Sequence, residues 1–192
     1  MGDITKIQNR YISVMIATAK LFHYYKSLAD KSIERLNDEQ LFFSHHAESN
    51  SVAVIMKHLA GNMISRWTDF LHSDGEKPWR DRDREFSTSN ESRAELLVYW
   101  EKGWSCLFDA LASLTDSDRH RIVYIRNEGH TVDEAIQRQI AHYAYQVGQI
   151  GFIAKMLSET RSSLSIPRNQ SLTYNQNKFI QDQSNRHFTE GI

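Results

Sequence analysis

Residues 138–157, RQIAHYAYQVGQIGFIAKML, decide the fold that the sequence predicts. Apolar residues recur here at steps of three and four, the period of an α-helix with one buried face. Together with the preceding turn, this face consists of Ala135, Ile136, Ile140, Tyr143, Val147, Ile150, Ala154 and Leu157. Thr131 and Glu134 form a capping box at the start. A helix is therefore predicted from Thr131 to about Ser158.

A polar seam runs along the flank of the same helix and consists of Gln139, His142, Gln146 and Gln149. Burying polar groups without partners costs about 1–3 kcal/mol each, so these side chains need water, other side chains or a ligand. Residues at i and i+4 face the same side of a helix, which suits two ligands of one metal ion. His58, on a second predicted helix, could converge on the same point. A hydrogen-bonded core histidine is the alternative interpretation of His142.

Three further apolar stripes with helical spacing predict long helices over residues 5–36, 51–72 and 92–114. Only two prolines occur in the chain, which favours long helices because proline breaks them. Residues 121–131, RIVYIRNEGHT, combine strand-forming residues with a turn and predict a small β-hairpin before the last helix. Trp67, Trp100 and Trp104 are expected in the core. The sequence thus predicts an all-α protein of four long helices with one inserted hairpin.

Two polar segments lie outside these helices. Residues 77–92, KPWRDRDREFSTSNES, mix both charges with small polar residues and are interpreted as a solvated connection. Residues 161–192 are rich in Ser, Asn and Gln and are too polar for a core helix. We expect residues 1–160 to form the helical domain. The extension is expected to pack on that domain, to pack on a partner subunit, or to be mobile.

Composition restricts the classes of function. The 192 residues carry a formal net charge of -1, which argues against nucleic acid as a partner. No apolar run approaches the roughly 20 residues that span a bilayer, and no signal peptide is recognisable, so no membrane partner is expected. Cys106 is the single cysteine, so no disulfide can form within the chain. We therefore expect a reducing, cytoplasmic setting.

Four segments together resemble the DinB/YfiT-like superfamily, in an uncharacterised branch, over roughly residues 5–175. The segments are SNSVAVIMKHLAGNMISRWTDFLHSDGEKPWR, WEKGWSCLFDAL, VYIRNEGHTVDEAI and RQIAHYAYQVGQIGFIAKML. The resemblance implies a four-helix bundle with up-down-down-up connections, frequently a homodimer. It also implies a divalent metal held by three histidines, two of which match His58 and His142. The third falls on position 146, where this chain has glutamine.

The resemblance implies two kinds of function. The first is a metal-dependent hydrolase, or a transferase of a small-molecule thiol of the bacillithiol type, that uses zinc or nickel. His58 and His142 would then be ligands, Gln146 a weak third ligand or an orienting group, and Asn62 and Gln149 nearby partners of the cofactor. An amide binds such metals less well than imidazole, so Gln146 is expected to weaken the site. The alternative is a non-catalytic dimeric bundle, or a binder of a small ligand, with a degenerate metal site.

Overall fold

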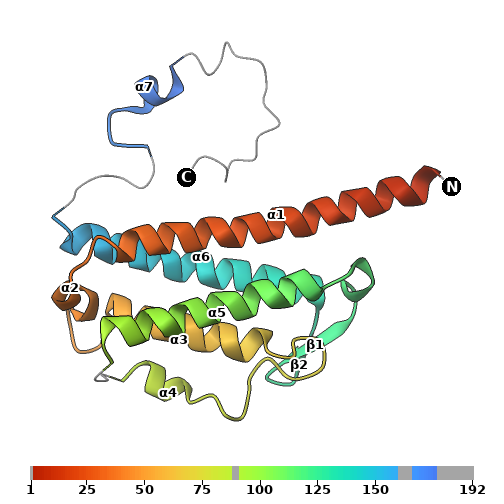
Figure 1. The fold of residues 1–192 in the computed structure, drawn as a ribbon, viewed down its shortest axis with the longest axis horizontal. Helices are drawn as coiled ribbons and strands as arrows, with labels where there is room; N and C mark the ends of the chain where they lie inside the picture. Colours follow the sequence, from red (N-terminus) through yellow and green to blue (C-terminus); the bar gives the residue numbers. More distant parts are fainter. Residues whose placement is uncertain (1, 88–90, 160–165, 177–192) are drawn as a thin grey trace.

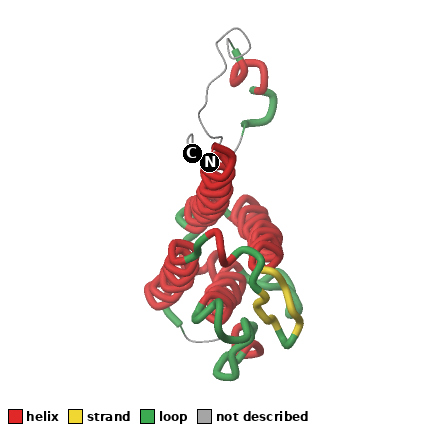
Figure 2. Tube along the Cα trace, turned by 90° about the vertical axis from the view of Figure 1, so that its right-hand side faces the viewer, coloured by secondary structure: helices red, strands yellow, loops and turns green. Residues whose placement is uncertain are grey.

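The computed structural model describes residues 2–87, 91–159 and 166–176 of the protein. This part of the chain is mostly helical, with one small antiparallel sheet (Figures 1 and 2). Its long helices are α1 (Gly2–Ile33), α3 (Val52–Trp67), α5 (Arg93–Ser113) and α6 (Val132–Leu157). α3 packs on α5 and α6, and α1 packs on α6 and α5. Each long helix therefore has two long neighbours, and the apolar core lies between them.

The shorter elements lie between these helices, except α7, which follows α6. They are α2 (Asp38–Phe42), α4 (Arg82–Glu85), η1 (Asp116–Asp118), β1 (Ile122–Ile125), β2 (Glu128–Thr131) and α7 (Ser171–Asn175). β1 and β2 pair antiparallel, with Ile125 opposite Glu128. The two residues of the turn, Arg126 and Asn127, have φ values of 56° and 62°, as a tight hairpin turn requires. The predicted hairpin before the last helix is confirmed.

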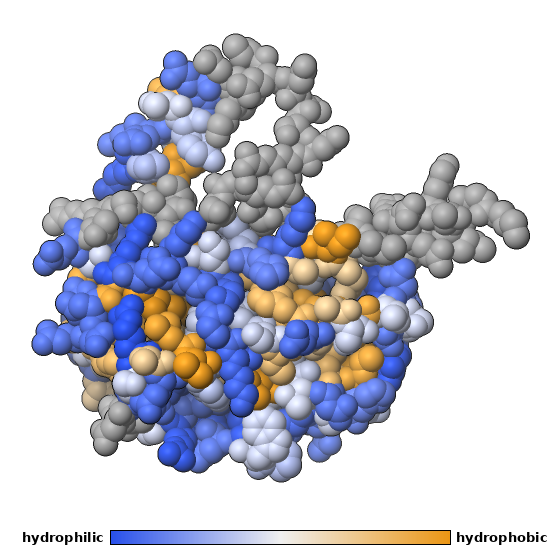
Figure 3. All heavy atoms as spheres, in the orientation of Figure 1, coloured by the Kyte–Doolittle hydropathy of each residue, from blue (hydrophilic) through white to orange (hydrophobic). Residues whose placement is uncertain are grey.

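Aromatic side chains form the centre of the core. Trp67, Trp100 and Trp104 are buried there, as predicted. Trp67 Nε1 donates a hydrogen bond to Tyr143 Oη (3.1 Å), and this hydroxyl donates to Asn62 Oδ1 (3.1 Å). A chain of hydrogen bonds thus links α3 and α6 inside an apolar environment. On the face shown in Figure 3, polar residues cover most of the surface, with smaller apolar patches between them.

α3 and α5 approach each other closely at Gly103. A Cβ atom at this position would lie 2.8 Å from the Cα of Ala60 on α3. That distance is shorter than van der Waals contact between carbon atoms. Glycine at 103 therefore sets how near the two helices can lie.

The predicted helix over residues 51–72 is too long at its C-terminal end. α3 ends at Trp67, Thr68 is extended, and Asp69 has a left-handed φ of 49°. The chain turns here because the Asp69 carbonyl accepts hydrogen bonds from the backbone N–H groups of His72 and Ser73. Phe70 nevertheless stays buried against Trp67, with ring centroids 4.8 Å apart. The apolar stripe was a correct sign of burial but continued past the helix.

The prediction that residues 77–92 form a solvated connection is wrong in part, because most of the described residues are exposed but Lys77, Arg80 and Glu85 are not. The segment contains α4, which packs on α3 (Figure 1). The Arg80 side chain is only 3% exposed, and Glu85 is also buried. Arg80 and Glu85 fold inward because they pair with each other, and Glu85 also pairs with His58 of α3. Residues 88–90 lie outside the described residues.

The polar extension is described only over residues 166–176. α7 is the helix of this stretch, and its residues are exposed or half-buried. Residues 160–165 and 177–192 lie outside the described residues, so the expectations for the extension stay predictions. Within the described ranges, no helix combines the length and the apolar character needed to cross a bilayer.

Candidate functional site

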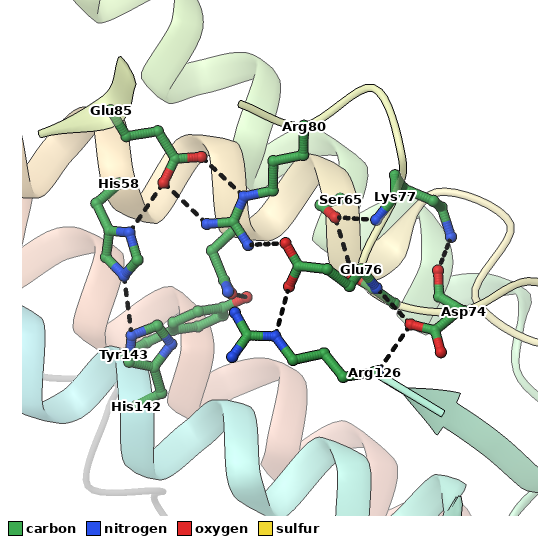
Figure 4. A network of polar contacts seen from close by, with 12 residues as sticks. His58, Ser65, Asp74, Glu76, Lys77, Arg80, Glu85, Arg126, His142 and Tyr143 are labelled. Carbon is green, nitrogen blue, oxygen red and sulfur yellow. Dashed lines mark hydrogen bonds and ion pairs between the residues drawn. The ribbon is translucent and has the colours of Figure 1, made fainter. Parts of the chain in front are cut away.

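Two histidines from different helices meet at the surface of the core. His58 lies on α3 and His142 on α6, and their Nε2 atoms are 3.4 Å apart (Figure 4). The ring centroids are separated by 5.4 Å with the planes steeply inclined, so the rings meet edge-on. The helical spacing predicted that these side chains converge, and the structure places them side by side.

A buried carboxylate orients His58. Glu85 Oε2 lies 2.9 Å from His58 Nδ1, and Arg80 donates to the same carboxylate through Nε (2.8 Å) and Nη2 (2.9 Å). Burial alone raises the pKa of Glu85, but the hydrogen bonds from His58 and Arg80 lower it below its ordinary value. An ionised carboxylate can only accept, so His58 Nδ1 donates to it. In a neutral ring, Nε2 then carries the lone pair that faces His142.

Gly61 makes room for this carboxylate. It follows His58 by nearly one turn of α3, and a Cβ atom at Gly61 would lie 2.8 Å from Glu85 Cδ and still closer to Oε1. Any side chain here would push Glu85 away from the helix. The sequence reasoning missed both Glu85 and Arg80, and the small residue near His58 was the one available signal.

Five arginines line a pocket of about 300 Å³ beside the histidine pair. They come from α3, the segment before α4, α4, the turn between β1 and β2, and α6, and are Arg66, Arg80, Arg82, Arg126 and Arg138. The carboxylates that contact or influence these arginines are Asp74, Glu76 and Glu85. Five guanidinium groups against three carboxylates leave the pocket with an excess of positive charge. The sequence did not predict this cluster, because its members lie far apart along the chain.

Two buried side chains of the pocket have polar atoms that lack partners among the described residues. These atoms are Nε and Nη1 of Arg66 and Oε1 of Gln139. Arg66 is 5% exposed and Gln139 is 2% exposed. Burial lowers the pKa of Arg66, which shows that its charge is poorly solvated. Unpaired buried groups of this kind are costly, and bound water, an ion or a ligand can satisfy them.

The other residues of the predicted site are divided between two places. Asn62 lines the arginine pocket, where its Oδ1 accepts from Tyr143. Gln146 is half-buried one turn beyond His142 and is not among the described residues that line this pocket. Gln149 lines a separate cavity of about 620 Å³, together with apolar residues such as Tyr145 and Phe152. The structure thus brings His58, His142 and Asn62 to one pocket, which Gln139 lines and Gln146 does not.

The described residues contain no cluster of three or more His, Cys, Asp or Glu side chains arranged to hold a metal ion. His58 and His142 are therefore a pair. A metal ion bound by them needs its third ligand from another kind of group, such as an amide oxygen or water.

Comparison with known proteins places the chain in a family. The model of a family described as "Protein of unknown function (DUF1572)" matches residues 6–170. The chain belongs to this family. DUF1572 is part of the DinB-like superfamily, in agreement with the resemblance seen in the sequence. No curated protein and no solved structure matches the chain.

The pH dependence of stability of this DUF1572 protein is expected to report His142. Burial first, and then the charges of His58, Arg66 and Arg80, lower the pKa of His142 from 6.5 to about 4. Between these pH values the unfolded chain binds a proton at His142 that the folded chain does not. The free energy of unfolding therefore has its full His142 contribution above pH 6.5 and loses it as the pH falls toward 4.

Urea unfolding of metal-free protein at pH 7 and pH 5 measures this effect. From pH 7 to pH 5, the free energy of unfolding should fall less in His142→Gln than in the parent protein. A ring titration by NMR with a pKa of 6.5 or more for His142 contradicts the prediction.

Proposed function

We propose that this DUF1572 protein is a metal-dependent enzyme of the DinB-like type, and that His58 and His142 hold its divalent metal ion. The observation that carries the proposal is the 3.4 Å separation of the two Nε2 atoms. Two imidazole nitrogens at about 2.1 Å from one tetrahedral zinc ion are about 3.4 Å apart. The separation of the pair therefore matches that of two imidazole ligands of one ion.

The surroundings of the pair support the same proposal. A histidine that binds a metal commonly donates its other N–H to a carboxylate, as His58 does to Glu85. A ligand must also be deprotonated, and with a pKa of about 4 His142 is neutral at pH 7. The third ligand is an amide oxygen: Gln146, as the resemblance implies, or Gln139, whose Oε1 is buried without a partner among the described residues. Zinc or nickel suits imidazole ligands.

The bound metal would lower the pKa of a thiol or a water molecule and so supply a nucleophile at neutral pH. The reaction is then thiol transfer of the bacillithiol type, or hydrolysis. Glu85 fixes the orientation of His58 and balances the charge of Arg80. Asn62, held by Tyr143, presents its amide to a molecule in the pocket.

We infer further that α1, α3, α5 and α6 form the DinB-like four-helix bundle with up-down-down-up connections. The contacts of each long helix with two others support this architecture. We propose that the protein acts in the cytoplasm as a homodimer.

Metal analysis of the purified protein tests the proposal. We expect about one zinc or nickel ion per chain, lost in His58→Ala and His142→Ala and kept in the control His72→Ala, which changes an exposed histidine. Gln146→His and Gln139→His identify the third position, since a third imidazole at the right place should raise affinity. Protein that takes up neither metal, and whose stability is the same in chelator, contradicts the proposal.

A second candidate is a non-catalytic dimeric bundle or a binder of a small apolar ligand. The cavity beside Gln149 favours it, because its border includes the exposed apolar residues Phe43, Tyr145, Phe152 and Met156. The metal analysis separates the two candidates. A metal-free protein that sediments as a dimer and is unaffected by chelator supports this second function.

A further inference from the structure

Four arginines of the pocket, Arg66, Arg82, Arg126 and Arg138, have no role in the metal proposal. We propose that the pocket binds the phosphate group of a small phosphorylated molecule, and that Arg82 and Arg138 are its principal contacts. As a statement about substrate class this rests on the proposed function, but phosphate binding itself does not require the metal.

The charge of the pocket points to an anion. Nine side chains line it, and all are polar: the five arginines, two histidines and two amides. This excess of positive charge attracts an anion, either alone or beside a metal ion held by the two histidines. A neutral apolar ligand would find no apolar side chain among the described lining residues.

The hydrogen-bond donors still open in the pocket point to the same conclusion. Arg80 is engaged with Glu85 and Glu76, and Nε of Arg126 contacts Glu76 (Figure 4). Arg66, in contrast, keeps Nε and Nη1 buried without partners among the described residues. Arg82 lies over the Phe86 ring, and Arg138 directs Nη1 to His130. Arg82 and Arg138 at the exposed side therefore offer donors to a ligand, and Arg66 adds positive charge at the buried side.

The arrangement favours phosphate over carboxylate. A planar carboxylate is satisfied by one guanidinium fork, as Glu85 is by Arg80. A tetrahedral phosphate offers oxygens in several directions and so can use guanidinium groups from two helices at once. The unpaired Oε1 of Gln139 requires a donor, which a hydroxyl of the ligand or of a monoprotonated phosphate supplies.

Titration calorimetry on the full chain in chelator, at pH 7.5 and constant ionic strength, tests the proposal. The probes are inorganic phosphate, glycerol phosphate and succinate. We expect the two phosphates to bind and succinate to bind at least about tenfold more weakly. Arg82→Gln and Arg138→Gln should each reduce phosphate affinity about tenfold, as expected for loss of a charge-assisted hydrogen bond.

Arg84→Gln is the matched control, because Arg84 is an exposed arginine of the same helix as Arg82 and is not among the described residues that line the pocket. It should change phosphate affinity less than twofold. Absence of phosphate binding at millimolar concentration, equal losses in the Arg82 and Arg84 variants, or succinate binding as tightly as phosphate each overturns the proposal. Phosphate binding by the parent protein, when that protein takes up neither zinc nor nickel, would overturn the metal proposal alone.

Discussion

Replacing Glu85 with alanine is expected to lower the free energy of unfolding by about 3–5 kcal/mol. Glu85 is buried and accepts hydrogen bonds from His58 and twice from Arg80, whose side chain is itself buried. Among the described residues, its removal leaves the Arg80 guanidinium with Glu76 as its one paired counter-charge, at 3.4 Å. Urea unfolding at pH 7 measures the loss. The same variant should bind zinc or nickel about 10- to 100-fold more weakly, because His58 is no longer oriented.

Two variants control this experiment. Glu85→Gln keeps an acceptor of the same size but removes the charge, so its loss of stability should lie between those of the parent and the alanine variant. Asp83→Ala removes an exposed acid from the same short helix and should stay within about 0.5 kcal/mol of the parent. If the Glu85 and Asp83 variants are equally stable, the buried carboxylate does not hold this segment on α3.

Replacing Trp67 with alanine is expected to lower the free energy of unfolding by about 3–5 kcal/mol as well. The side chain is 2% exposed, contacts Phe22 edge-on and lies against Phe70, so its loss leaves a large cavity. It also removes the hydrogen bond to Tyr143 Oη. Thermal and urea unfolding measure the change.

Trp79→Ala is the matched control, since this tryptophan is 59% exposed and should change stability by about 0.5 kcal/mol or less. Tyr143→Phe tests the polar part of the effect, because it removes the hydroxyl and leaves Trp67 Nε1 and Asn62 Oδ1 without this partner. The double variant Trp67→Ala/Tyr143→Phe should lose less free energy of unfolding than the sum of the losses in the two single variants, because both remove the same hydrogen bond. Strict additivity would mean that this hydrogen bond contributes nothing to stability.

Local patterns predicted the elements of the fold well where periodicity and caps decide the structure. The capping boxes at Ser92 and Thr131 start α5 and α6 as expected, with each Ser or Thr side chain accepting from a backbone N–H. A turn was predicted at Asn127 to Gly129, but the two residues with left-handed φ are Arg126 and Asn127, and Gly129 lies in β2. The facing pair of His58 and His142 could also be anticipated, since each lies at the edge of an apolar stripe.

Long-range pairing decided the features that the sequence did not predict. Residues 77–92 look like a solvated run because charged residues are usually exposed, and only contact with His58 and Gly61 explains why Glu85 is buried. The arginine pocket draws its members from positions as far apart as 66 and 138. Gln139 lines it and Gln146 does not, because about two turns of α6 separate the two amides and the pocket lies on the N-terminal side of His142.

The contact between Gly61 and Glu85 makes two distant positions of the sequence interdependent. A relative with a side chain at the position of Gly61 has no space for a carboxylate at the position of Glu85, and such a relative should have its α4 segment placed differently. A relative with glycine at the position of Gly61 and an acid at the position of Glu85 can keep a carboxylate hydrogen-bonded to the histidine at the position of His58. Members of the DUF1572 family can therefore be sorted by this pair of positions before any of them is assayed, and the sorting predicts which of them share the chemistry of this site.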